Sequence, residues 1–168
     1  MAKLKTLEQL YLDQLEGLYD AEKRILKALP KVASASSETA LRTALEDHAE
    51  QTREHVDRLD RVFRGLGKTA KGKTCDSMKG ILEESDRAVG GTDNAAVRDA
   101  GIIAAVQRVE HYEIAAYGSA RTWAMQLGDA AGAQLLEQTL DEEKAADKKL
   151  TEVAVSTANR RAQQAAAS

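Results

Sequence analysis

The sequence is poor in residues that break helices or cross-link chains. It holds one proline and one cysteine in 168 residues, and aromatic residues make up 4% of it. A single cysteine excludes an intramolecular disulfide and is typical of a reducing compartment. No stretch of about 18 apolar residues occurs, so no membrane-spanning helix is expected. The start, MAKLKTLEQL, is too polar for a signal peptide. We therefore expect a cytoplasmic protein.

Charge is abundant, but it is not of one sign. Charged residues make up 30% of the chain, and the net charge is −3 with acids and bases interspersed. No basic stripe with interleaved aromatic residues is present, so a nucleic-acid partner is not expected. The composition is rich in helix-forming Ala, Leu, Glu, Gln, Lys and Arg, and no period-2 pattern of a strand is convincing. At this length, we predict one all-α domain.

The apolar periodicity and the turn residues predict four long helices and a short one. Thr6 and Gln9 match a capping box at the start of the first helix, and Pro30 is expected to kink or end it. Ser36 or Ser37 is expected to cap the second helix. The later helices are expected over residues 38–64, 75–89, 94–126 and 130–156.

A long connection over residues 68–93 separates two helical hairpins. It contains the short helix, and Thr92 or Asp93 at its end is expected to cap the next helix. A connection of this length usually crosses a bundle. We predict a ferritin-like four-helix bundle over residues 1–158, made of two helical hairpins joined by a long crossover that contains a short helix. Residues 159–168 are polar and small, and they are expected to fray.

Acidic residues interrupt the apolar face of the helix that contains VEHYEIAAYG. Glu110 and Glu113 lie three residues apart in an inward stripe that otherwise holds Ile103, Val106, Tyr117 and Ala120. A buried carboxylate is costly unless something neutralises it. The stripe therefore indicates a site rather than ordinary packing.

The polar residues of the other helices fall at matching levels of the predicted hairpins. Glu22 and His48 are equally far along the chain from Ala35, in the first turn. Glu113 and Glu143 are equally far from the second turn, and Glu110 and Asp147 nearly so. If the hairpins dock at matching heights, one layer contains Glu22, His48, Glu110, Glu113, Glu143 and Asp147.

That layer would hold five carboxylates and one imidazole, and no Lys or Arg falls in the inward stripes. Mutual repulsion would prevent five ionised acids from sharing it. The acids could be partly protonated, or they could bind cations. Two divalent ions supply four positive charges, and carboxylates with an imidazole suit iron or manganese. The predicted cofactor is therefore a pair of iron or manganese ions.

Several neighbouring residues are assigned other roles. His55 lies two turns from His48, about 10 Å along the helix axis, so we expect a core or surface histidine outside the layer. His111 is beside the stripe, where an interhelix hydrogen bond is expected. Thr52 could orient a ligand, and Tyr117 is a core residue or a redox neighbour of Glu113.

Four segments, LYDAEKRILKALPK, DHAEQT, VEHYEIAAYG and LDEEKAADKKL, resemble the YciE/YciF family of ferritin-like proteins. The resemblance spans about residues 4–155. It implies a bundle related to rubrerythrin and manganese catalase, a carboxylate-bridged dimetal centre, a homodimer and a bacterial stress response. Better-known relatives carry Glu-x-x-His on the second and fourth helices. Here Leu45 stands three residues before His48, and Ala146 takes the histidine position after Glu143.

These observations favour a stress-response protein with a di-iron or di-manganese centre that reacts with peroxide or oxygen. The ligands implied by the resemblance are the six residues of the layer. The alternative is a non-enzymatic helical stress or interaction protein with a structural metal or none. Iron storage ranks last, because a storage cage needs many subunits and the sequence has no clear fifth packing helix.

Overall fold

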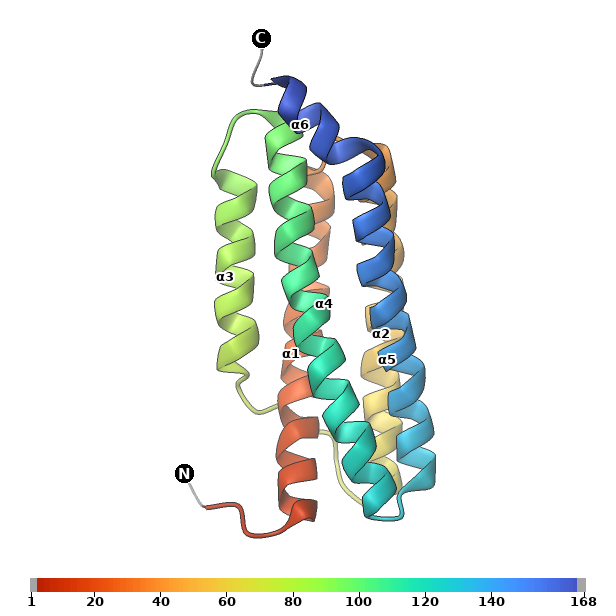
Figure 1. The fold of residues 1–168 in the computed structure, drawn as a ribbon. Coiled ribbons are helices and arrows are strands. Elements are labelled where there is room, and N and C mark those ends of the chain that lie inside the picture. The colour runs from red at the N-terminus through yellow and green to blue at the C-terminus, as the bar shows by residue number, and fades with distance from the viewer. Residues whose placement is uncertain (1–2, 166–168) are drawn as a thin grey trace.

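The computed structural model describes residues 3–165, and over that range its regular elements are all helices. Four long helices form the bundle, and a shorter one lies in the crossover (Figure 1). The helices are α1 (Leu7–Ala35), α2 (Thr39–Gly65), α3 (Asp76–Gly90), α4 (Ala95–Gln126) and α5 (Ala130–Val153), followed by a π-helical turn (Ala154–Ala158) and α6 (Asn159–Ala165). The all-α class is confirmed, and the predicted helices lie within a few residues of the observed ones.

The helices pack as two antiparallel hairpins. One hairpin is α1 with α2, the other is α4 with α5, and the two dock through α2 against α5 and α1 against α4. The crossover between the hairpins contains α3, which lies outside the bundle against α4 and α1 (Figure 1). This arrangement confirms the predicted ferritin-like connectivity.

The bundle core consists of two apolar clusters, one toward each end. One cluster includes Ile25, Leu45 and Val106, and the other includes Leu18, Leu59 and Leu140. On each of the four long helices, the polar residues that interrupt the apolar stripe lie between members of the two clusters. The polar layer is therefore enclosed by hydrocarbon above and below.

Two helices begin with caps that differ from the predicted ones. Asn94 caps α4 by accepting bonds from the backbone N–H groups of Ala96 and Val97, where Thr92 or Asp93 was expected. No serine caps α2. Instead, buried Asp99 of α4 accepts bonds from the backbone N–H groups of Ser37 and Glu38, at 2.9 Å each. These bonds join the start of α2 to the opposite hairpin.

The ends of the bundle also differ from the sequence expectation. α1 continues through Pro30 to Ala35, so the proline does not end the helix. The chain after α5 stays helical through a π turn into α6, where fraying was expected, and Arg161 pairs with Glu38 at 2.6 Å. Residues 166–168 of the predicted tail lie outside the described residues.

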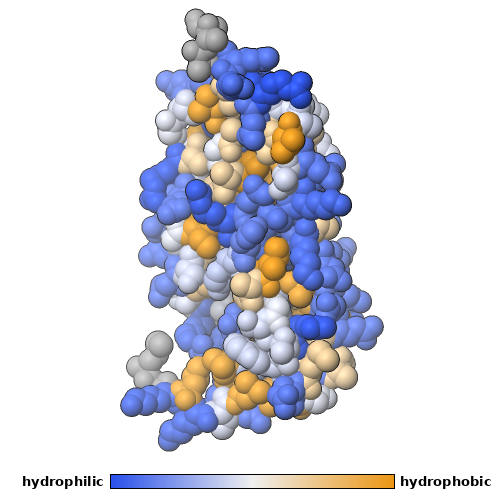
Figure 2. All heavy atoms as spheres, viewed as in Figure 1, coloured by the Kyte–Doolittle hydropathy of each residue, from blue (hydrophilic) through white to orange (hydrophobic). Residues whose placement is uncertain are grey.

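The surface is largely hydrophilic on the face drawn in Figure 2, with hydrophobic side chains scattered along its length. Within residues 3–165, no helix combines the length and the apolar character that crossing a lipid bilayer requires.

Candidate metal centre

Four glutamates from three helices meet in the polar layer. Glu22 projects from α1, Glu110 and Glu113 from α4, and Glu143 from α5, and all four are fully buried. The spacing of three residues puts Glu110 and Glu113 on the same face of α4. The described residues include no lysine or arginine that forms an ion pair with any of the four carboxylates.

Two histidines of α2 complete the cluster. His48 Nε2 lies 3.4 Å from Glu110 Oε1 and 3.9 Å from Glu143 Oε2. His55 Nδ1 lies 3.0 Å from Glu143 Oε1 and 3.3 Å from Glu22 Oε1. The two imidazole rings are 6.3 Å apart between centroids, so they bracket the carboxylates from one side of the layer.

These six residues form two overlapping groups of metal-ligating atoms. The first group is His48, Glu110, Glu113 and Glu143, and the second is Glu22, His55 and Glu143. In each group, one ligand atom from every residue lies within 4.8 Å of the others. Glu143 belongs to both groups, so it would be shared by two ions if each group held one.

The cluster contains buried polar atoms that have no hydrogen-bond partner. Ten buried side-chain nitrogen and oxygen atoms of the described residues lack one, and all ten belong to these six residues. Such an atom costs about 1–3 kcal/mol when it is left without a partner. Both oxygens of Glu110, Glu113 and Glu143 are among them. The donor set therefore fits ions that would contact these atoms.

The pKa shifts show that burial disfavours the charged forms of three of these carboxylates. Burial and the charges of Glu143 and Glu22 raise the pKa values of Glu110 and Glu113 well above the usual range, and burial also raises the pKa of Glu22. Burial lowers the pKa of His55, but Glu143 and Glu22 reverse this effect and raise it to about 10. Four ionised carboxylates would carry the charge that two divalent cations balance.

Residues outside the cluster hold its ligands in place. His55 Nε2 lies 2.8 Å from Glu142 Oε2, and Arg58 donates two bonds to the same carboxylate, of 2.5 and 2.8 Å. This contact fixes the orientation of the His55 ring and leaves Nδ1 facing the centre. On the other side, the buried Tyr117 hydroxyl donates a 2.5 Å bond to Glu22 Oε1.

Five of the six predicted site residues come together, and Asp147 does not. Asp147 accepts a 2.9 Å bond from Gln107 Nε2 and lies 3.3 Å from His111 Nε2, near the surface. Asp147 follows Glu143 by four residues of α5, and four residues rotate by about 40° more than one full turn of the helix. Asp147 therefore projects in a different direction from Glu143, toward the edge of α4. The interhelix contact expected for His111 is present, with Asp147 as its partner.

His55 lies in the cluster, contrary to the prediction from its distance along α2. The two ring centroids are 6.3 Å apart, closer than the rise of about 10 Å between the two positions, so the two side chains extend toward each other along α2. The sequence contains a signal for this, because His48 and His55 are two turns apart on one inward stripe. Thr52 between them orients no ligand; its hydroxyl donates a 2.8 Å bond to the carbonyl of His48.

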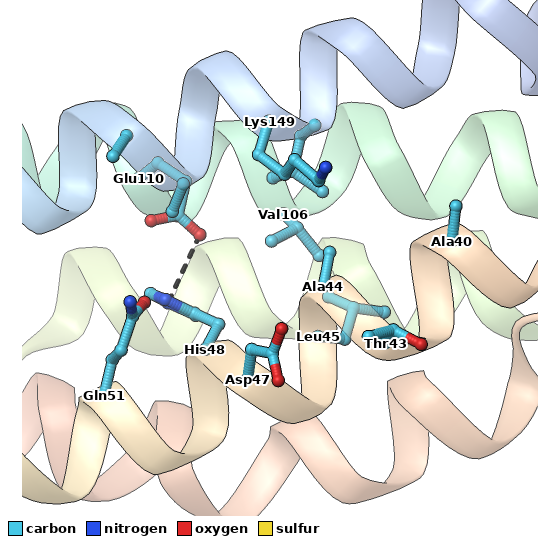
Figure 3. A pocket seen from close by; sticks show the side chains of 13 residues that line it. Ala40, Thr43, Ala44, Leu45, Asp47, His48, Gln51, Val106, Glu110 and Lys149 are labelled. Carbon is cyan, nitrogen blue, oxygen red and sulfur yellow. Dashed lines mark ion pairs between the residues drawn. The ribbon is translucent and has the colours of Figure 1, made fainter.

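One side of the centre opens into a pocket of about 450 Å³ between α2 and α5. Figure 3 shows His48 and Glu110 pointing toward one another at its inner end. Ala44 of α2 and Ala146 of α5 line it, together with Val106 of α4. The pocket brings a small molecule up to His48 and Glu110, two residues of the first group, whose nitrogen and oxygen atoms are themselves buried.

The sequence is similar to known proteins over nearly its whole length. The family described as a domain of unknown function, DUF892, matches residues 6–163. Protein YciF of Escherichia coli is 42% identical over 161 residues, which cover 95% of this chain and 97% of that protein.

Solved structures share the fold. The crystal structure of the E. coli stress protein YciF matches with a TM-score of 0.89 and 42% identity, covering 93% of this chain and 99% of the other. A Rhodopseudomonas palustris protein named YcfI, described as a candidate structural protein, matches with a TM-score of 0.87 and 40% identity over 89% and 95% of the two chains. A Xanthomonas campestris protein at 19% identity, with a TM-score of 0.75 over 95% and 98% of the chains, has the same fold.

Proposed function

The chain belongs to the YciE/YciF family, which shares the DUF892 domain, and on this premise we propose a function for its buried centre. The protein is a ferritin-like stress-response protein that binds two divalent ions, iron or manganese, and reacts with peroxide or oxygen. The E. coli relative is a stress protein, which supports the physiological part of the proposal. The family resemblance further implies a homodimer.

One observation carries the proposal. Among the described residues, the ten buried side-chain nitrogen and oxygen atoms that lack a hydrogen-bond partner all belong to the six residues of the cluster. His48, Glu110, Glu113 and Glu143 would hold one ion, and Glu22, His55 and Glu143 would hold the other. A donor set of carboxylate oxygens with imidazole nitrogens and no thiolate suits iron or manganese. Two divalent ions would also neutralise the four carboxylates, with which no lysine or arginine of the described residues forms an ion pair.

Ions held here would supply redox chemistry toward peroxide or oxygen, and the protein would control access and protonation. Glu142 accepts the Nε2 proton of His55, so this imidazole would give up its Nδ1 proton to bind an ion through Nδ1. The Tyr117 hydroxyl holds a proton against Glu22 Oε1. The two apolar clusters exclude water from both ends of the layer, which strengthens electrostatic interactions within it.

Elemental analysis of Glu110→Ala tests the proposal. The wild type, purified without added metal, should contain about two iron or manganese ions per chain, the number that the two ligand groups hold. The variant should lose paired binding but keep its helical circular dichroism. Glu83→Ala, which removes an exposed glutamate of α3, should keep both ions. Retention of both ions by Glu110→Ala would count against the assignment.

A second candidate is a structural or interaction protein without redox activity. The description of the R. palustris relative as a candidate structural protein favours it. A fully folded wild type that contains no metal would put this alternative first. Size-exclusion chromatography of the same samples checks the homodimer, and a cage-sized assembly would instead indicate iron storage.

A further inference from the structure

The pocket between α2 and α5 is larger than the proposed oxidants require. Its volume is about 450 Å³, whereas a water molecule occupies about 30 Å³ of liquid, and peroxide and dioxygen are of similar size. The pocket reaches His48 and Glu110 at its inner end, so an occupant would meet the centre (Figure 3). A pocket of this size at a ligand group indicates that a larger molecule enters.

Small side chains create the space. Ala40 and Ala44 of α2 face Ala145 and Ala146 of α5 across the pocket. Ala44 and Ala146 are partly buried. Because their side chains end at Cβ, they leave room between the two helices for an external molecule.

The lining combines an apolar body with a polar inner end. Leu45, Val106 and Leu150 contribute hydrocarbon. His48 and Glu110 close the inner end, and their side-chain nitrogen and oxygen atoms are buried without hydrogen-bond partners. Asp47 and Lys149 add one exposed charge of each sign to the lining. With an ion held at His48 and Glu110, this pattern suits a molecule with an apolar chain and an anionic oxygen-donor group.

We propose that the pocket binds a small organic carboxylate, with its head toward the ion at His48 and Glu110 and its apolar chain along Ala44, Ala146 and Val106. This inference rests on the proposed metal centre and adds the class of organic substrate to it. The carboxylate oxygens would add ligands to an ion held by the first group. The chain would replace water along the alanine-lined walls.

Calorimetric titration of the Mn²⁺-loaded protein with butanoate and octanoate tests the inference. Octanoate has four more methylene groups than butanoate. Their partial burial should make the wild type bind octanoate at least about tenfold more tightly than butanoate. Ala146→Leu should remove this gain, and so should Ala44→Leu, which fills the pocket from the other helix. Ala131→Leu, at an exposed site in the first turn of α5, should keep the gain.

Metal content, circular dichroism and elution volume are measured for every sample. Equal affinity for the two carboxylates in metal-loaded wild type overturns the inference and leaves the metal centre standing. Equal octanoate affinity with and without Mn²⁺ overturns it too, because the head group would not face the centre. A changed oligomeric state of Ala146→Leu would identify the pocket as a contact between chains and overturn it. A wild type that takes up no metal overturns both proposals.

Discussion

Glu142 and Glu143 are adjacent in the sequence, yet they contact opposite nitrogens of one histidine. Glu142 Oε2 lies 2.8 Å from His55 Nε2, and Glu143 Oε1 lies 3.0 Å from His55 Nδ1. One residue is part of the buried cluster, and the other lies at its margin in a two-bond contact with Arg58. Successive positions of α5 thus supply a member of the cluster and a carboxylate that orients the His55 ring.

We predict that Glu142→Ala weakens metal binding about 10–100-fold, the usual effect of losing a carboxylate that orients a histidine ligand. The variant leaves His55 Nε2 without its acceptor, so the ring is no longer held with Nδ1 toward the centre. Competition with a chelator measures the affinity. The stoichiometry at saturating metal should stay at the wild-type value, because no proposed ligand is removed.

Glu137→Ala is the matched control for that variant. Glu137 is also a glutamate of α5, and it also pairs with an arginine, Arg121, but it lies outside the cluster. Its loss should leave the metal affinity within about twofold of wild type, as expected for an exposed ion pair. Equal weakening by both variants would show that Glu142 acts on the stability of α5 rather than on His55.

The metal-free protein should lose stability as the pH rises from about 5 to 8. In the unfolded chain, glutamates have pKa values of about 4.3. In the folded protein, burial raises the pKa values of Glu22, Glu110 and Glu113. The folded state therefore binds more protons in this range, and unfolding releases them. His55, with its pKa raised to about 10, acts in the same direction above the pKa of an unfolded histidine.

The sign of this dependence follows from linkage. Each excess proton of the folded state lowers the free energy of unfolding by about 1.4 kcal/mol per pH unit. The lowered pKa of Glu143 acts only in acid, where its contribution is lost as pH falls. Urea titrations of chelator-treated protein measure the slope, and Glu113→Gln should reduce it. A free energy of unfolding that increases with pH would contradict the prediction.

Sequence patterns predicted the parts of this protein that depend on local chemistry. Periodicity and turn residues located the helices, and equal distance from a turn placed Glu113 level with Glu143, because antiparallel helices rise at the same rate. The same rule placed Glu22 level with His48, whereas Glu22 contacts His55. The cap of α2 could not be found in this way. Its acceptor, Asp99, lies on another helix, and only the docking of the hairpins brings it there.

The errors at the centre have a common origin in side-chain direction. The number of residues from a turn gives the position of a residue along the helix axis. It does not give the direction in which the side chain points. His55 leans back into the layer, and Asp147 turns away from it, although its backbone lies one turn from Glu143. Both outcomes depend on the rotation about the helix axis and on the side-chain rotamer, which residue spacing alone does not specify.

One pair of variants tests whether His55 rather than Asp147 belongs to the metal centre. His55→Ala removes the only imidazole of the second ligand group, which leaves Glu22 and the shared Glu143. Binding should fall from two ions per chain to one, held by the first group. Asp147→Ala removes a carboxylate that already has Gln107 as a partner, so both ions should stay.

Anaerobic titration with Fe²⁺, followed by elemental analysis after gel filtration, gives the stoichiometry of both variants. Circular dichroism confirms that each remains helical, because His55→Ala leaves a buried space between Glu22 and Tyr117. Two ions in His55→Ala and fewer in Asp147→Ala would restore Asp147 as a ligand. That result would require α5 to rotate when metal binds, since Asp147 now points toward Gln107 and the exposed side chain of His111.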